Sequence, residues 1–528
     1  HIFKANPIVI EKLREQKNLL FNGELVHSYP HSWRSKAPLV HRATPQWFIS
    51  MESHKLRDKA LKAIDETTFY PSKGKERLKS MIETRPDWCV SRQRVWGVPL
   101  PIFVNKKTKE ILIDDEVTEN IATIYENEGS DCWFADDPQR FLGNKYKAED
   151  YDKLSDIVEV WFDSGSTHSF VLEKREDLKW PASMYLEGSD QHRGWFHSSL
   201  LESCGTRGRA PFESILSHGF VVDGKGLKMS KSLGNVIAPE DILKKYGADI
   251  LRIWVASSNY AEDLRIDYSI LDQHAESYRK IRNTFRYLLG NINDKYETIN
   301  FDELDVDSLP ELEQLMLHKI YVLNSNFKKY FKNYDFHNLY KELLNFCTVD
   351  LSAFYFDIRK DNLYCDPIDT EKRKSTILLL NIILNALLKW FAPILSFTTE
   401  EIFKLLFKDQ KSIHLEKFLE FPDKFKNEKL SNKWIELVKI RNICNISIEE
   451  KRASKEIGSS LEANLKIEIN QKLKNLTENT DFSELCITSK AEVSYKEDAE
   501  TTAITSKAKG TKCPVCWKIN EGPCPRHG

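Results

Sequence analysis

Three short apolar segments of the sequence each end in a group of glycine and polar residues, and helical stretches separate them. The segments are 158–162, 183–186 and 214–216, and the polar groups that follow them are Asp163–Ser166, Glu187–Gln191 and Ser217–Asp223. Strands that alternate with helices predict a parallel α/β sheet. Ligands of such sheets bind beyond the carboxyl ends of the strands. We therefore expect a binding site where these three polar groups meet.

Four polar residues at this edge have suitable chemistry for a substrate. A carboxylate such as Glu187 can hold an ammonium group, and Asp190 and Gln191 can fix hydroxyls or amides. His218 precedes Gly219, where the backbone can approach a flat base closely. Each of these residue types is also common in helix caps and turns. Their convergence on one edge favours the binding interpretation.

A lysine-rich loop follows the third segment. Residues 223–235 contain three glycines and three lysines, and the next acidic residue is Glu240. Glycines let the backbone bend where other residues would be strained. Lys228 and Lys231, three residues apart on this loop, suit the phosphates of ATP, and more so as charge builds on the α-phosphate in the transition state. The alternative is an ordinary solvated turn.

Composition sets few limits on the partners of the chain. Its 528 residues suffice for several domains, and 77 Lys and Arg balance 79 Asp and Glu to a net charge of -2. Any RNA-binding surface must therefore come from local clustering. The longest apolar run, 377–388, is interrupted by Asn381 and Asn385 and is too short for a membrane span. Ten scattered cysteines indicate a reducing compartment, and we expect a cytoplasmic protein with no membrane contact.

Long helices are predicted from Gln273 onward. An apolar stripe runs to Gly290, which is expected to end the first helix. Helical spacing continues through Leu312–Phe331, Phe336–Phe356 and Ile377–Phe391, and Thr398 with Glu401 suggests a capping box for a fifth helix. These segments predict a helical bundle of roughly 150 residues.

The pattern of the last hundred residues predicts a small domain of mixed helix and strand. Asn432–Glu456 is predicted to be a further helix, and Leu465, Ile467 and Ile469 alternate with polar residues like a strand. Asp498–Lys512 is polar and is expected to be partly mobile.

The C-terminal residues contain two pairs of metal-ligand residues. Cys513 and Cys516 form one pair, Cys524 and His527 the other, and seven residues separate the pairs. Two pairs with two-residue gaps can close a tetrahedral site, and thiolates with an imidazole suit Zn²⁺. Four protein ligands leave no open position for water, so we expect one structural zinc. The histidines near the N-terminus, His1 among them, match no ligand spacing and are expected to be structural.

Several runs resemble the class I aminoacyl-tRNA synthetases. Residues 228–232 read Lys-Met-Ser-Lys-Ser, the signature of that class, and the resemblance implies that Lys231 binds ATP. Residues 91–99 and 185–196 resemble the isoleucyl-tRNA synthetases in particular. That likeness implies that Glu187 and Gly188 belong to the aminoacyl-adenylate site. It also implies that Trp96 and Trp195 wall a pocket for a branched side chain.

The same resemblance covers the helical half and the tail. Residues 335–338 and 392–397 resemble the anticodon-binding domain of that family, and the family usually has a fourth cysteine where this chain has His527. The implied domains are the end of an editing insertion (1–45), the second half of the catalytic domain (46–272) with an inserted subdomain near 105–155, an anticodon-binding bundle (273–430), a small mixed domain (431–500) and a zinc tail (501–528).

The resemblance implies an ATP-dependent attachment of isoleucine to tRNA(Ile), with Mg²⁺ accompanying ATP and the enzyme a monomer. The His-Ile-Gly-His signature of the class is not in these residues. We therefore expect a C-terminal segment of a longer enzyme that lacks the first half of the catalytic fold and most of the editing domain, and that alone activates no amino acid. A valine-specific enzyme and a non-catalytic tRNA- or zinc-binding relative are the alternatives.

Overall fold

The computed structural model describes residues 4–32, 35–292, 299–407, 411–498 and 500–528. His1 therefore lies outside the described residues. The chain divides into two compact units: one comprises residues 1–58 and 84–166, the other residues 59–83 and 167–528. Each unit is described by itself below.

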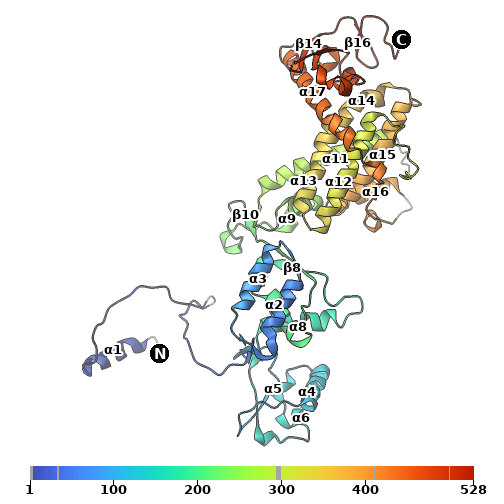
Figure 1. The fold of residues 1–528 in the computed structure, drawn as a ribbon. Helices are drawn as coiled ribbons and strands as arrows, with labels where there is room; N and C mark the ends of the chain where they lie inside the picture. The colour runs from blue at the N-terminus through green and yellow to red at the C-terminus, as the bar shows by residue number, and fades with distance from the viewer. Residues whose placement is uncertain (1–3, 33–34, 293–298, 408–410, 499) are drawn as a thin grey trace. The chain divides into compact units, whose positions relative to one another are not determined.

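The first unit is built from short antiparallel strand pairs and helices. Its strand pairs are β1 (Phe48–Ile49) with β3 (Trp88–Cys89), β4 (Ser91–Arg92) with β7 (Ile157–Val158), and β5 (Phe103–Asn105) with β6 (Tyr151–Lys153). Its helices are α1 (Ala5–Glu15), α4 (Asp115–Glu128), α5 (Cys132–Ala135), α6 (Pro138–Leu142) and α7 (Val160–Gly165). The residues between β5 and β6 contain α4, α5 and α6 (Figure 1), and they have a core of their own around the buried Trp133 and Phe141.

The strand predicted over 158–162 is wrong. Only Ile157–Val158 is extended, it pairs antiparallel with β4, and α7 begins at Val160. Between them, the buried carboxylate of Glu159 accepts hydrogen bonds from Trp88 Nε1 at 2.6 Å and from Arg92 Nη2 at 2.8 Å. These contacts fix the turn from strand to helix. A five-residue apolar alternation is too short to distinguish the two structures.

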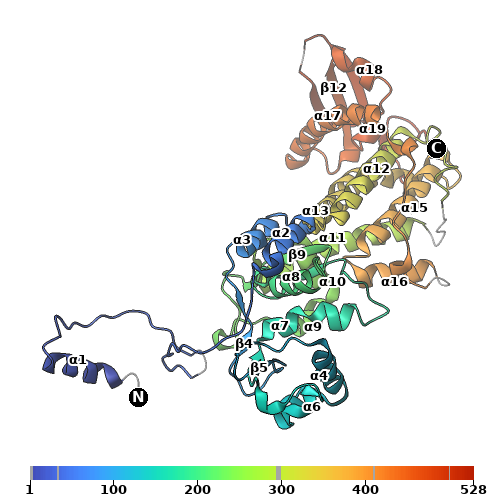
Figure 2. The same cartoon turned by 60° about the horizontal axis from the view of Figure 1, so that its bottom comes forward.

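The second unit contains the predicted parallel sheet. Its strand order is β2 (Thr68–Tyr70), β9 (Ser214–His218) and β8 (Tyr185–Gly188), with both pairings parallel. Helices α2 (Leu56–Glu66), α3 (Lys73–Glu83) and α8 (Trp195–Thr206) lie beside it (Figures 1 and 2). β8 and β9 lie where the sequence pattern predicts strands, whereas β2, which has only three residues, was not predicted.

A smaller parallel pair extends this region. β10 (Val221–Asp223) pairs with β11 (Leu264–Ile266), and α9 (Pro239–Tyr246) and α10 (Ala248–Ser257) connect them. Ile242, Trp254 and Leu264 are buried together between these elements. The predicted start of α9 at Pro239 is confirmed. Gly247 has a φ of 86° after its last residue, a conformation that favours glycine.

The helical bundle follows the sheet directly. Its elements are α11 (Tyr268–Ile292), α12 (Glu311–Lys332), α13 (Phe336–Asn345), the π-helix η7 (Phe346–Tyr355), α14 (Phe356–Cys365), α15 (Glu371–Phe391) and α16 (Ser396–Leu406). Apolar side chains from all of them form one continuous core. Among the described residues, α15 is the one helix long and apolar enough to cross a membrane, so the expectation that its apolar run is too short for a span is wrong by this criterion. Of its apolar window, 67% is buried, as in a core helix.

Three details of the predicted bundle are wrong. Gly290 does not end α11, which continues to Ile292. The helix expected over Phe336–Phe356 changes to π-helical geometry at Phe346 and continues as α14. Thr398 is not a cap, because it lies inside α16, where its hydroxyl donates to the buried Asp249 carboxylate at 2.6 Å.

The C-terminal region is a three-stranded sheet packed on a long helix. The elements are α17 (Glu428–Ala453), β12 (Ala463–Asn470), α18 (Lys474–Thr477), α19 (Phe482–Leu485), β13 (Lys490–Lys496) and β14 (Thr502–Lys507), followed by the hairpin of β15 (Thr511–Lys512) and β16 (Ile519–Asn520). The predicted strand at Leu465–Ile469 is confirmed as part of β12, the central strand of the sheet. The expectation of a mobile Asp498–Lys512 is wrong for Thr502–Lys507, which pairs antiparallel with β12 and buries Thr505.

Candidate active site and metal centre

A cavity of about 550 Å³ opens at the carboxyl edge of the sheet in the second unit. At this edge Gly188 of β8 pairs with His218 of β9. Tyr70 ends β2, which pairs with the other side of β9. His218 and Gly219 line the cavity, as does Gly226 from the lysine-rich loop. Of the three polar groups that the strand pattern placed at one site, those after β8 and β9 contribute to this cavity, whereas Asp163–Ser166 belongs to the first unit.

His192 gives the cavity a buried, neutral imidazole. Its Nδ1 lies 2.8 Å from the carbonyl oxygen of Ser189, and its buried Nε2 has no hydrogen-bond partner among the described residues. Burial lowers the pKa of this imidazole. A Cβ atom at Gly74 would lie only 3.2 Å from His192 Nε2, so this approach of α3 suits glycine. His192 was not among the site residues predicted from the sequence.

The cavity also contains cationic groups that the sequence analysis missed. Lys73 forms an ion pair with Glu262, with 3.0 Å between Nζ and Oε1. The guanidinium groups of Arg77 and Arg265 form no ion pair with any described residue, and both residues line the cavity. This excess of positive charge favours an anionic ligand. Arg77 was missed because it lies on α3, after the unrecognised strand β2.

The predicted polar residues after β8 are brought together. Glu187 is exposed, and its Oε1 accepts a hydrogen bond from the backbone N–H of Gly188 at 2.9 Å. Asp190 and Gln191 follow in a 3₁₀ turn, and Gln191 Oε1 accepts from the backbone N–H of Trp195 at 2.9 Å. The side chain of Gln191 thus fixes the first residue of α8. Glu187, Asp190 and Gln191 all lie within four residues of Gly188, which pairs with His218 in the sheet.

The two tryptophans of the predicted side-chain pocket belong to different units. Trp195 stacks on Tyr185 of β8, with ring centroids 4.0 Å apart and an interplanar angle of 4°. Trp96 lies in the first unit, in which it is 89% exposed. That they wall one pocket stays a prediction.

The lysine-rich loop is held by its acid and amide side chains. Asp223 accepts from the backbone N–H groups of Lys225 at 3.0 Å and Leu227 at 2.8 Å. The Asn235 amide donates to Asp223 at 2.9 Å, and its Oδ1 accepts from the backbone N–H of Ser230 at 2.9 Å. The amide of Asn235 and these N–H groups lower the pKa of Asp223.

Within this loop the two predicted phosphate ligands point outward. Lys228 and Lys231 are both exposed, and neither forms an ion pair with a described residue. Gly226 has a φ of 83°, and a Cβ atom at Gly224 would lie 2.1 Å from Asp267 Oδ2. The glycines therefore permit a tight backbone path, and the lysine ammonium groups remain available to a ligand.

The four predicted metal ligands converge in the C-terminal tail. One donor atom each from Cys513, Cys516, Cys524 and His527 lies within 4.8 Å of the others. Cys516 and Cys524 sulfurs are 3.8 Å apart, and His527 Nδ1 lies 3.6 Å and 3.5 Å from the sulfurs of Cys513 and Cys524. A tetrahedron with metal–sulfur bonds of about 2.3 Å has sulfur–sulfur edges of about 3.8 Å, so the cluster has the size of a zinc site.

The surroundings of the cluster suit metal binding. His527 Nε2 lies 3.0 Å from the carbonyl oxygen of Cys365, which leaves Nδ1 to face the thiols. Such an outer hydrogen bond orients a metal-binding imidazole. The backbone N–H groups of Cys516 and Val515 lower the pKa of the Cys513 thiol to about 6, which favours the thiolate.

Comparison with known families agrees with this architecture. A family model described as tRNA synthetases class I (I, L, M and V) matches residues 12–267, and one described as the anticodon-binding domain of tRNA ligase matches residues 313–469. The structure also resembles Mycobacterium tuberculosis methionyl-tRNA synthetase in complex with methionyl-adenylate. The TM-score is 0.51 at 16% identity, over 72% of this chain and 67% of that one. The parallel sheet and helical anticodon-binding region are those of a class I synthetase.

Curated relatives narrow the assignment. The isoleucine–tRNA ligase of Pelagibacter ubique (strain HTCC1062) is 78% identical over 527 residues, which are 100% of this chain and 58% of that protein. The isoleucine–tRNA ligase of Brucella abortus biovar 1 (strain 9-941) is 47% identical over 532 residues, 97% of this chain and 54% of that protein. The chain belongs to the isoleucine–tRNA ligase family. It spans a little over half the length of the curated relatives it matches.

Proposed function

We propose that the protein containing this chain attaches isoleucine to tRNA(Ile) in two steps. In the first, a carboxylate oxygen of isoleucine attacks the α-phosphorus of ATP, and the bond to pyrophosphate breaks. In the second, a ribose hydroxyl of the tRNA attacks the acyl carbon, and AMP leaves. The observation that carries this proposal is the 78% identity to an isoleucine–tRNA ligase along the whole chain.

The cavity at the sheet edge is the proposed ATP site. Lys228 and Lys231 bind the phosphates from the loop, and their charge stabilises the negative charge that builds on the α-phosphate. The backbone at His218 and Gly219 can closely approach the flat base of ATP. Mg²⁺ accompanies the phosphates as part of the substrate. The unpaired guanidinium groups of Arg77 and Arg265 support an anionic ligand here.

The amino-acid site is proposed beside it. Glu187 is exposed at the end of β8, where its carboxylate can bind the ammonium group of isoleucine. Gly188, Asp190 and Gln191 contact the adenylate through backbone and polar groups. Trp195, which stacks on Tyr185, provides a wall for the branched side chain. No side chain acts as a nucleophile, so positioning and charge stabilisation lower the barrier.

We assign a structural zinc ion to the tail. Cys513, Cys516, Cys524 and His527 would hold it with no position left for water. The ion would cross-link the two turns that carry these ligands.

The remaining proposals concern the domain organisation and the oligomeric state of the protein. Residues 1–45 close an editing insertion, 46–272 complete the catalytic domain with a subdomain near 105–155, and 273–430 bind the anticodon arm of tRNA(Ile). Residues 431–500 form a small mixed domain, and 501–528 form the metal tail. We propose that the protein acts as a cytoplasmic monomer, and that these 528 residues alone activate no amino acid because they contain no His-Ile-Gly-His run.

The test measures ATP–pyrophosphate exchange by the full-length protein. Exchange that depends on isoleucine, and that is much weaker with valine or leucine, is the expected result. One methylene in an apolar pocket contributes about 1–3 kcal/mol, so valine should be activated about 10- to 200-fold less efficiently. A preference for valine would contradict the assignment. Isoleucine-dependent exchange by the 528-residue chain alone would contradict the proposal that this segment is inactive.

A further inference from the structure

The cavity at the sheet edge contains a small polar surface beside α3. It is formed by His192, which follows β8, and by Ser217 of β9, and both residues line the cavity. His192 is 1% exposed and Ser217 is 6% exposed. Their side chains meet opposite Gly74 of α3, because a Cβ atom at Gly74 would lie 3.2 Å from His192 Nε2 and 3.5 Å from Ser217 Oγ. We refer to these three residues as the α3 notch.

The imidazole of His192 presents a hydrogen-bond acceptor to the α3 notch. The carbonyl oxygen of Ser189 can only accept a hydrogen bond, so His192 Nδ1, 2.8 Å away, must carry the proton of the ring. Burial and the nearby charge of Arg77 lower the pKa of the ring, which therefore stays neutral. Nε2 then has a lone pair and no hydrogen-bond partner among the described residues. The ring stands edge-on to Phe196, with centroids 5.6 Å apart and an interplanar angle of 88°.

The glycine of the α3 notch leaves both polar atoms uncovered. Gly74 is not among the glycines with positive φ, so its backbone conformation would permit a side chain, and alanine is the stronger helix former. An alanine methyl group at this point would contact His192 Nε2 and cover Ser217 Oγ. The Ser217 hydroxyl makes no hydrogen bond with any described residue. An acceptor and a hydroxyl group are therefore both open to a ligand at one point of the cavity wall.

Cationic groups lie next to the α3 notch. Arg77 follows Gly74 by three residues on α3, and residues at this spacing lie on the same face of a helix. The charged residues that line the cavity comprise three cations and two acids: Lys73, Arg77, Arg265, Glu262 and Asp263. Glu262 is paired with Lys73, whereas the guanidinium of Arg77 has no ion-pair partner among the described residues. A ligand with hydroxyl groups close to a phosphate would match both parts of this wall.

We propose that the α3 notch binds the ribose hydroxyls of ATP. One hydroxyl donates to His192 Nε2, and the neighbouring hydroxyl forms a hydrogen bond with Ser217 Oγ. The ribose is bonded directly to the phosphate chain, so phosphates near Arg77 place it beside the notch, whereas the amino group of adenine lies at the far end of the nucleoside. This inference rests on the proposed function, in which ATP is a substrate, and it adds His192, Ser217 and Gly74 to the residues of that site.

The test measures the binding of ATP, 2′-deoxy-ATP and 3′-deoxy-ATP to the full-length protein by titration calorimetry without isoleucine. In the wild type, at least one deoxy analogue should bind about tenfold more weakly than ATP, because it leaves a buried group of the notch unpaired. This factor corresponds to about 1.4 kcal/mol. Gly74→Ala and His192→Phe should weaken ATP binding by about tenfold and bind that analogue as tightly as ATP. Ser217→Ala should lose the preference for the other hydroxyl.

The ratio of the dissociation constants of the deoxy analogue and ATP separates a direct contact from a change in packing. A variant that only disturbs the packing of α3 weakens all three ligands alike and keeps the ratio at about ten. That outcome in both Gly74→Ala and His192→Phe overturns the proposal, as does a wild-type ratio near one. The matched control is Gly290→Ala in α11, where a Cβ atom would meet nothing within 4 Å. Its ratio should equal that of the wild type, and a ratio near one in this variant also overturns the proposal.

Inosine triphosphate distinguishes the ribose from the base, because it has an oxygen where adenine has its amino group. If Gly74→Ala abolishes a preference for ATP over inosine triphosphate and keeps the preference for the hydroxyl, the notch contacts the base and the ribose assignment is overturned.

The proposed function fails on a different observation, the absence of isoleucine-dependent pyrophosphate exchange by the full-length protein. Exchange together with an unchanged hydroxyl ratio in the variants would leave the function standing and remove the role of the notch. A ratio that falls to one in the variants of a protein without exchange would keep the notch and remove the function. Absence of ATP binding by the wild type would overturn both.

Discussion

The C-terminal tail and the lysine-rich loop are both short segments with a strong residue pattern, yet their side chains are arranged in opposite ways. In the tail, the four side chains Cys513, Cys516, Cys524 and His527 already meet at one point. In the loop, the backbone is fixed by Asp223 and Asn235 while the two lysines are exposed. The ligands proposed for the two segments explain the difference. A metal site needs all donors within bonding distance at once, whereas a phosphate site can present cations that complete their contacts only when the substrate binds.

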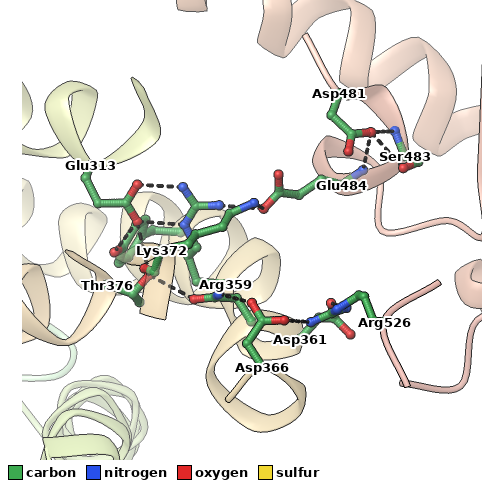
Figure 3. Close-up of polar contacts among 12 residues, drawn as sticks. Glu313, Arg359, Asp361, Asp366, Lys372, Thr376, Asp481, Ser483, Glu484 and Arg526 are labelled. Atoms are coloured by element: carbon green, nitrogen blue, oxygen red, sulfur yellow. Dashed lines mark hydrogen bonds and ion pairs between the residues drawn. The ribbon is translucent and has the colours of Figure 1, made fainter. Parts of the chain in front are cut away.

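The two regions also differ in how they are anchored. Arg526 in the tail forms ion pairs with Asp361 and Asp366 of the bundle (Figure 3). Nearby, Arg359 is 3% exposed and joins Glu313 on α12 to Glu484 on α19 (Figure 3). Asn362 donates to Asp366, and the Thr376 hydroxyl contacts Asn362 Oδ1 at 3.1 Å and Glu313 Oε1 at 3.3 Å, so the ion pairs of the tail connect to this buried network. The lysines of the loop form no ion pair with a described residue.

Loss of one metal ligand should give the largest effect. Cys516→Ser should reduce bound zinc from one ion per chain to almost none in metal analysis of purified protein. Structural zinc binding is worth about 10–16 kcal/mol, and a site with three ligands keeps little of it. The hairpin of β15 and β16 should then become sensitive to protease.

Cys365→Ser is the matched control for this change. The Cys365 thiol lies beside the tail and donates to the carbonyl oxygen of Val515 at 3.6 Å, but it is not one of the four converging ligands. Full zinc content in this variant is expected. Substoichiometric zinc in the wild-type chain would contradict the assignment of the cluster.

Removal of the buried arginine should give the next largest effect. Arg359 Nε and Nη2 donate to the two oxygens of Glu313 at 2.6 Å and 2.5 Å, and Glu313 is fully buried. Arg359→Met leaves that carboxylate without its cation. Breaking a buried ion pair costs about 3–5 kcal/mol. The opening free energy of the backbone amides in α12 and α19, measured by hydrogen exchange, should therefore fall by that amount.

The double variant Arg359→Met with Glu313→Gln provides the control, because it removes both charges. Its loss should be smaller than the sum of the two single losses. Additive losses would mean that the pair does not act as a unit.

Lys231→Ala should have a large effect on catalysis in the full-length protein and none on the fold. Loss of one group that stabilises transition-state charge typically reduces kcat by about 10²–10³. Isoleucine-dependent exchange should fall by that factor, and Lys225→Ala, a lysine of the same loop outside the signature, should change it little. Equal activity of the two variants would refute the role assigned to Lys231.

The same contrast explains what could be predicted from the sequence. The tail ligands lie within fifteen residues of one another, so their spacing alone predicted that they converge. The strand ends of β8 and β9 were predicted because polar residues directly follow apolar ones. The helices of the bundle were predicted from their apolar stripes.

Features that depend on distant segments were not predicted. Arg77, on α3, lies at the cavity because the preceding three-residue strand β2 pairs with β9. The π-helix of η7 left no signal, because an apolar stripe looks the same in both helix types. Thr398 looked like a cap in the local sequence, but Asp249, about 150 residues earlier, binds it inside α16.

Asn235→Ala should give the smallest effect and shows how the loop is held. The side-chain amide of Asn235 donates to the Asp223 carboxylate at 2.9 Å and accepts from Ser230 N at 2.9 Å, and this variant loses both contacts. We expect faster hydrogen exchange at the amides of Lys225, Leu227 and Ser230, with the metal tail unaffected. The pKa of Asp223 should rise toward its ordinary value, because the amide that holds it down is gone.

Acidification gives an independent check on the same contact. A depressed pKa means that the folded loop favours ionised Asp223, so its contribution to loop order is present above the ordinary pKa of aspartate and is lost as the pH falls through the depressed value. Amide protection in the wild-type loop should decrease over that window, and the Asn235→Ala loop should lose its protection at a higher pH. If both loops exchange equally at every pH, the Asp223–Asn235 contact does not hold the loop, and the positions of Lys228 and Lys231 must be set by the substrate alone.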